Sequence, residues 1–185
     1  MKLLVTAAAA GLAVTLAQVK LHLRLDPSSN HEDDLLRMLI KVSTERASHE
    51  TGRALLTTGY SLTADSRERL KLPKPNLIAI SAVTKYDDQG AASVCTTDDY
   101  TIIRTSAIAE VKPLVRDYDH IVVEYTAGYG AAADSLPAAI CQWILVDLAT
   151  LYENREAFTL GKAEVANAIP YPYVGGLLDP YRVEY

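Results

Sequence analysis

Residues 124–157 read EYTAGYGAAADSLPAAICQWILVDLATLYENREA, a stretch with the signals of a strand, a glycine break and a helix in that order. Val122 and Tyr125 favour an extended chain, and Gly128 permits the positive φ that ends it. Pro137 suits the first turn of a helix, where its missing N–H leaves no hydrogen bond unmade. The stretch therefore predicts a strand that leads through a short glycine-containing turn into a helix.

The predicted helix at 137–155 is amphipathic. Its apolar residues recur at helical spacing and are Ile140, Ile144, Leu148 and Leu151, with Trp143 and Tyr152 widening the same face. Gln142, Asp147 and Glu153 lie largely away from that face. No catalytic group is embedded in it, so we interpret 137–155 as a core helix and not as an active-site helix.

Local signals predict two further helices, at about 15–25 and 31–51. Thr15-Leu16-Ala17-Gln18 is a capping box that opens the first helix, and Asp26-Pro27 stops it because the residue before proline is pushed out of the helical region. Gly52 ends the second helix as a left-handed cap. The sequence thus indicates a bundle of at least three helices.

Acidic residues gather where the second helix begins. The possible metal ligands of this region are His22, Asp26, His31, Glu32, Asp33 and Asp34. Carboxylates in a first turn complement the positive end of the helix dipole, and this electrostatic role explains them without a metal. We therefore predict no metal site.

The middle of the chain, about 54–127, is rich in β-favouring residues. Runs such as 77–86 and 100–104 are separated by turn-forming residues, among them Asp87-Asp88-Gln89-Gly90. Four or five antiparallel strands are expected, and the paired aspartates are interpreted as turn residues and not as an acid–base pair. The predicted fold class is α+β, a small helical bundle with an antiparallel β-rich insertion and an extended C-terminal tail at 163–185.

Length, composition and net charge exclude some classes of function. The chain has 185 residues, 49% of them hydrophobic, which suits a single domain with a sizeable core, here 14–162. A net charge of -5 argues against a protein whose main task is to grip nucleic acid. The two cysteines form no zinc pattern, and Cys141, inside the predicted helix, is interpreted as a small buried hydrophobic residue.

The N-terminal residues, MKLLVTAAAAGLAVTLAQ, permit two interpretations. Lys2 before an apolar run resembles a secretory signal, which would be removed at about residue 17. Such cleavage would damage the helix start at Thr15, and the run is too short and alanine-rich to span a bilayer. We expect 1–13 to be an arm, with a strand at Leu3 to Thr6, that docks on this subunit or a neighbour.

Catalytic signatures are missing from the sequence. It contains no G-x-S-x-G, H-E-x-x-H, G-x-x-x-x-G-K-[ST] or strand-linked G-x-G-x-x-G motif. His120, beside a predicted strand, is interpreted as structural or exposed. We expect no enzymatic activity, no catalytic residue and no cofactor.

Several blocks of sequence resemble the head-tail connector (adaptor) family of tailed bacteriophages and gene transfer agents. The blocks are Val14-Thr15-Leu16-Ala17-Gln18-Val19-Lys20 with His22-Leu23-Arg24, Thr51-Gly52-Arg53-Ala54-Leu55, Tyr125-Thr126-Ala127-Gly128-Tyr129-Gly130, Leu136-Pro137-Ala138-Ala139-Ile140, Tyr152-Glu153-Asn154-Arg155-Glu156-Ala157 and Asp179-Pro180-Tyr181-Arg182-Val183. They occur in the family's order over most of the chain from about residue 14. The family's prolines near the N-terminus are replaced here by alanines, so the resemblance is weakest in the arm.

The resemblance implies a structural virion protein in the neck, made in the host cytoplasm. Such a connector forms a ring, dodecameric in the family, beneath the portal protein, extends the DNA channel without sequence-specific binding and receives a stopper or tail-completion protein. No membrane is involved. The alternative function is a small secreted enzyme or binding protein with a cleaved N-terminal signal.

The C-terminal tail holds the candidate contact residues. Tyr171, Tyr173, Tyr181 and Arg182 are of the types enriched in interface hot spots, and they lie in an irregular segment with Pro170, Pro172 and Gly175-Gly176. Either the tail packs on its own domain or, as the resemblance implies, it contacts a ring neighbour or the portal.

Overall fold

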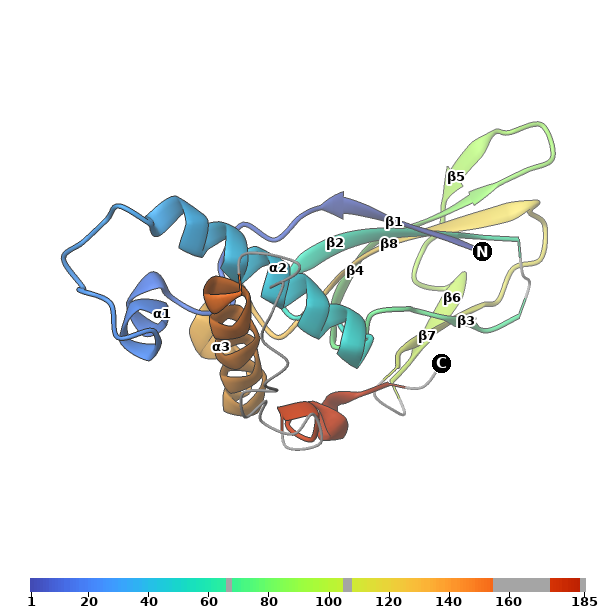
Figure 1. Cartoon of the computed structure of the whole chain (residues 1–185). Helices are drawn as coiled ribbons and strands as arrows, with labels where there is room; N and C mark the ends of the chain where they lie inside the picture. The colour runs from blue at the N-terminus through green and yellow to red at the C-terminus, as the bar shows by residue number, and fades with distance from the viewer. Residues whose placement is uncertain (66–67, 105–107, 155–173, 184–185) are drawn as a thin grey trace. The chain divides into compact units, whose positions relative to one another are not determined.

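The computed structural model of the protein describes residues 1–65, 68–104, 108–154 and 174–183, which form two compact units (Figure 1). The strand unit comprises Met1–Ala10 and Gly52–Ala131. The helical unit comprises Gly11–Thr51 and the described residues from Ala132 onward. The predicted α+β class is confirmed, and the strands are inserted between two helical segments as expected.

The first helix of the helical unit, α1 (Leu16–His22), begins at the predicted capping box. Gln18 N–H donates to Thr15 Oγ1 at 3.2 Å, and Thr15 N–H donates to Gln18 Oε1 at 2.8 Å. The helix is shorter than the predicted 15–25 because Arg24 adopts a left-handed φ of 56°. Leu25 N–H then bonds to Lys20 O and Arg24 N–H to Leu21 O, which closes the helix before Asp26-Pro27 is reached.

Helices α2 (Asp33–Thr51) and α3 (Ala138–Glu153) form the rest of this unit and follow the sequence prediction closely. Gly52, at φ 70°, ends α2. The short 3-10 turn η1 (Ala133–Ser135) precedes α3, whose predicted core face is confirmed. Its buried residues are Ile140, Trp143, Ile144 and Leu148. Cys141 is only half-buried, so the prediction of a buried thiol was wrong for this position; its Sγ lies 3.8 Å from Ala13 O.

Polar contacts connect the parts of the helical unit. Lys20, only 8% exposed, places Nζ 2.7 Å from Asp33 Oδ1 and 2.6 Å from Ser29 O, which joins α1 to the start of α2. Arg46 on α2 pairs with Asp147 on α3 at 2.6 Å. These charge-assisted contacts connect α1 to α2 and α2 to α3.

The strand unit contains two antiparallel sheets in its described residues. The larger sheet has the order β1-β2-β8-β4-β5 and the smaller one β3-β7-β6. Their bounds are β1 Lys2–Ala7, β2 Thr58–Ala64, β3 Leu70–Lys71, β4 Leu77–Tyr86, β5 Ala92–Val94, β6 Tyr100–Ile103, β7 Glu110–Pro113 and β8 His120–Ala127. The described part of 54–127 therefore holds seven strands, more than the four or five predicted, because β3, β5 and β7 are too short to show alternation. The predicted strand of the N-terminal arm is confirmed, and it pairs with β2 of the same chain.

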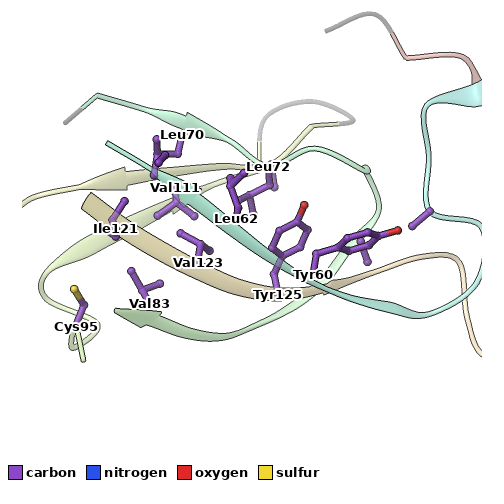
Figure 2. Close-up of a cluster of buried hydrophobic side chains, with 14 of the residues drawn as sticks. Tyr60, Leu62, Leu70, Leu72, Val83, Cys95, Val111, Ile121, Val123 and Tyr125 are labelled. Atoms are coloured by element: carbon purple, nitrogen blue, oxygen red, sulfur yellow. The ribbon is translucent and has the colours of Figure 1, made fainter. Parts of the chain in front are cut away.

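The core of the strand unit lies between these sheets (Figure 2). Inward-facing residues of neighbouring strands meet at the same level, as Tyr60 does with Tyr125 and Leu62 with Val123. The rings of Tyr60 and Tyr125 stack with their centroids 5.5 Å apart. Leu70 and Val111 of the smaller sheet belong to the same cluster, so both sheets share one apolar interior.

Two glycines are required by close approaches of the backbone. A Cβ at Gly59 would lie 3.0 Å from Thr6 Oγ1 and 3.1 Å from Ala7 Cβ, so Gly59 lets β1 lie close against β2. Gly128, at φ 141°, would place a Cβ 2.5 Å from Leu56 O. Only glycine fits the second position, which is where the strand predicted from residues 124–157 ends.

Candidate assembly surfaces

Two of the four contact residues predicted from sequence lie in the described part of the chain. Tyr171 and Tyr173 fall outside the described residues. Tyr181 closes the 3-10 turn η2 (Asp179–Tyr181), which Pro180 helps to start, and Arg182 follows it in an extended conformation. Tyr181 is half-buried and Arg182 is exposed.

The end of the tail is anchored to the C-terminal end of α2. Val183 N–H donates to Thr51 O at 3.1 Å, which satisfies a carbonyl that the helix itself leaves unpaired. Arg182 Nη2 lies 3.5 Å from Glu50 Oε2, and its Nε lies 3.6 Å from Asp179 Oδ1. Leu178 is 1% exposed. The last described residues thus pack on their own helical unit, while the guanidinium of Arg182 keeps an exposed side from which it can still bind another carboxylate.

Exposed apolar side chains form a second kind of candidate surface. In the helical unit they are Leu21, Met38 and Val42, and in the larger sheet they are Leu4, Val5, Ile78 and Val94. Leu4, Val5 and Ile78 lie on strands β1 and β4, and their exposed fractions are 50%, 60% and 46%. The sequence did not single out these residues, because an apolar strand residue has the same pattern whether its strand is central or at an edge.

Carboxylates line a depression of about 290 Å³ at the end of the sheet where the β4–β5 turn lies. Its lining residues are Asp87, Asp88, Asp117, Tyr118 and Asp119. The turn prediction is confirmed, since Asp87 Oδ1 accepts hydrogen bonds from Gln89 N–H and Ala91 N–H, and Gly90 adopts φ 83°. In the part of the chain that the structure describes, no group of three or more residues is placed to hold a metal ion.

Side chains on the rim of this depression are paired. Lys85 Nζ lies 3.0 Å from Asp117 Oδ2, and this bond raises the pKa of Lys85 and lowers that of Asp117. His120 stacks on Tyr86 at 4.6 Å and lies 3.1 Å from Asp119 Oδ2. His120 is half-buried and makes these two contacts within the strand unit.

Acidic residues near the start of α2 also form hydrogen bonds and ion pairs with nearby side chains. Asp26 accepts hydrogen bonds from the N–H and hydroxyl of Ser28, which hold its pKa below the ordinary range. Glu32 accepts a bond of 2.5 Å from Tyr152 on α3. Asp33 forms an ion pair with Lys20. It also lies in the first turn of α2, where a carboxylate interacts favourably with the helix dipole.

Burial raises the pKa of both thiols, Cys95 and Cys141, which disfavours the reactive thiolate. Among the described residues, no helix is both long and apolar enough to cross a bilayer. The candidate surfaces in the described residues are the tail end, the apolar sheet edges and the acidic end of the sheet.

Comparison with known proteins identifies a similar family of sequences and similar solved structures. Residues 13–102 match the family described as phage gp6-like head-tail connector protein. No curated protein sequence matches the chain.

Solved structures share the fold over the whole chain. A chain from the neck of an empty gene transfer agent particle computed with C6 symmetry has a TM-score of 0.82 and 22% identity, covering 100% of this chain and 97% of that one. A chain from the virion of a native gene transfer agent particle has a TM-score of 0.81 at the same identity and coverage. A chain from the neck of a native particle computed with C12 symmetry has a TM-score of 0.73 and 20% identity. Residues 13–102 are thus similar to the phage gp6-like head-tail connector family, and the fold of the chain is similar to that of chains from gene transfer agent necks.

Proposed function

We propose that the protein is a head-tail connector that forms a ring in the virion neck, bound beneath the portal, and that the ring extends the DNA channel and receives a stopper or tail-completion protein. The observation that carries this proposal is the family match together with a fold shared along the entire chain with chains of gene transfer agent necks. A twelve-copy ring would match the C12 symmetry named for one of those necks.

The proposed role is structural and not catalytic. Its mechanism is geometric, since many modest contacts repeated by cyclic symmetry give a stable collar through their effective concentration. A net charge of -5 suits a wall past which DNA slides, because an acidic surface does not capture phosphates. The anchored end of the tail supports its use as a contact, since η2 presents Tyr181 and Arg182 in a fixed geometry.

The experiment that tests this function is co-sedimentation of the full-length protein with purified portal rings. We expect the protein to move with the portal in a sucrose gradient and to add a ring of density at one end of the portal in electron micrographs. A gradient in which the two separate at every concentration would contradict the proposal. The intact mass of the protein from particles should include residues 1–17; loss of that segment would favour the secreted alternative.

A further inference from the structure

The registers of the larger sheet show that its first and fourth strands span the same levels. Val5 pairs with Tyr60, Tyr60 with Tyr125, and Tyr125 with Ile80. In the same way, Leu4 pairs with Ser61, Ser61 with Glu124, and Glu124 with Ala82. Leu4–Ala7 of β1 therefore stand at the height of Ala79–Ala82 of β4, on the other side of the β2–β8 pair, and Lys2 stands at the height of Thr84.

Both of these strands present an unpaired edge in the described residues. β1 is the first strand of the sheet, and nothing in the described chain pairs with its outer side. On the other side, β5 pairs only with Thr84–Tyr86 of β4, and Cys95 N–H adds one bond to Val83 O. The edge of β4 from Leu77 to Ala82 is left without a strand partner among the described residues.

These two edges are apolar and lie beside the core. Leu3, Leu77 and Ile80 are partly buried and pack against the apolar cluster of the strand unit. Leu4, Val5 and Ile78 are exposed. Long apolar edges are normally blunted in proteins that stay monomeric, since they template pairing with another chain. Two bulges, at Ile78 and Ser81, are the described irregularities of β4, and they bend the strand without placing a charge on it.

The strand directions make the two edges complementary. Every neighbouring pair from β1 to β4 is antiparallel, so β1 and β4 run in opposite directions within one sheet. If a second copy is placed beside the first by rotation about an axis along the strands, its Leu4–Ala7 segment meets Ala79–Ala82 of β4 antiparallel and at the same level. Its Lys2 then comes to the end of β5 at Val94, which pairs with Thr84. Two different edges of one chain that fit each other give a head-to-tail contact, the type that closes into a ring.

We propose that the Leu4–Ala7 segment of β1 of one copy adds to the Leu77–Ala82 edge of β4 of the next copy, so that the sheet continues from subunit to subunit around the ring. This inference rests on the proposed ring function. Pairing in level register places Val5 of one copy beside Ile80 of its neighbour, on the face that carries the core. The exposed apolar side chains at both edges are then covered by a second copy of this chain.

Cross-linking between cysteines tests the contact. In a background with Cys95→Ala and Cys141→Ala, the pair Leu4→Cys with Ala82→Cys is treated with a short bismaleimide, whose span also covers a register shifted by two residues. Because each copy then carries both halves of the contact, we expect a ladder of dimers, trimers and higher species on denaturing gels. Leu4→Cys alone should give no species beyond the dimer. The matched control is Leu4→Cys with Gln89→Cys, which places the second thiol on the exposed turn between β4 and β5, farther along the sheet from Ala82, and should give no ladder.

A charge at the proposed contact provides a second measurement. Val5→Lys should leave the thermal melt unchanged, since the side chain is 60% exposed, but should lower the yield of the ladder and of rings on the portal at least tenfold. Leu114→Lys, at a position that is 53% exposed just after β7 of the smaller sheet, should leave both yields unchanged.

The possible outcomes separate this inference from the proposed function. A ladder from Leu4→Cys with Gln89→Cys, or dimers alone from Leu4→Cys with Ala82→Cys, would overturn the β1–β4 contact. Rings of wild-type appearance formed by Val5→Lys would also overturn it and leave the connector function standing. Failure of the wild-type chain to bind the portal would overturn the function, even if the ladder formed in solution.

Discussion

The phenol of Tyr125 donates a hydrogen bond of 2.5 Å to the carbonyl oxygen of Pro73, which lies 52 residues earlier in the chain. This bond fixes the loop from Pro73 to Asn76, in which Lys74 and Asn76 both adopt positive φ values, 63° and 69°. Arg53 Nη1 holds the same loop by a 3.0 Å bond to Asn76 Oδ1. The loop leads directly into β4, so these contacts set where the proposed edge begins.

Tyr125→Phe should lower the free energy of unfolding by about 1 kcal/mol, because the partly buried carbonyl of Pro73 loses its donor while the stacked ring is kept. Urea denaturation followed by circular dichroism measures this change. Tyr86→Phe, which removes a phenol from a half-buried ring of the same sheet, is the control and should be close to neutral. Equal effects of the two substitutions would show that the bond to Pro73 contributes nothing specific.

Gly128→Ala should destabilise the fold by about 1 to 3 kcal/mol or more, because φ is 141° and the new Cβ would lie 2.5 Å from Leu56 O. Gly90→Ala provides the comparison, since φ is also positive, at 83°, but nothing lies within 4 Å of the new atom. The second substitution should cost about 1 kcal/mol, from backbone conformation alone. Thermal melts of both variants separate the steric contribution from the conformational one, and a smaller loss at Gly128 than at Gly90 would contradict the close approach.

Leu148→Ala should lower the free energy of unfolding by about 2 to 5 kcal/mol, since the side chain is 0% exposed and its removal leaves a cavity beneath α3. Gln142→Ala on the exposed side of the same helix should change stability by less than about 0.5 kcal/mol. Denaturant titrations of the two variants give the comparison. An unchanged midpoint for Leu148→Ala would mean that this face is not part of the core.

Asp117→Asn should remove a stabilising contribution that depends on pH. The pKa of Asp117 is lowered in the folded state by its bond to Lys85, so its contribution is present above the ordinary aspartate pKa of about 3.9 and is lost as the pH falls through the lowered value. The pKa of Lys85 is raised by the same bond, so the contribution is also lost at alkaline pH, above about 10.4. The difference in Tm between wild type and Asp117→Asn should therefore be largest between these limits. A difference that stays constant from pH 3 to pH 7 would show that the ion pair is not its source.

Tyr181→Ala and Arg182→Ala should each weaken binding to portal rings by about 1 to 3 kcal/mol if the tail end is a hot spot of that interface. These substitutions test the contact more directly than removing the whole tail after Lys162 would. Removal of the tail would also delete Leu178, which is buried in the helical unit. Co-sedimentation at a series of protein concentrations gives the affinities. Glu50→Gln is the matched control, since it breaks the ion pair within the chain and keeps Arg182 available. Equal losses for Glu50→Gln and Arg182→Ala would indicate that Arg182 acts only by anchoring its own tail.

The sequence by itself determined the helices and turns of this protein. Thr15 and Gln18 form the capping box that their spacing predicts, Gly52 ends α2, and Asp87 with Gly90 makes the turn between β4 and β5. Each of these signals acts between residues that are at most four positions apart. The chemistry that forms such an element is therefore complete within a short window of sequence.

Only the tertiary structure decided which strands become neighbours and which edges remain open. Val5, Ile80 and Cys95 belong to β-favouring segments, but nothing near them in sequence says that the first lies on an outer strand, the second at an uncovered edge and the third in the core. Strand order joins residues that are tens of positions apart, as in the pairing of Val5 with Tyr60 and of Ile80 with Tyr125. Such pairings depend on the burial and hydrogen bonding of the whole sheet at once, so the surfaces proposed for assembly appear only when the chain has folded.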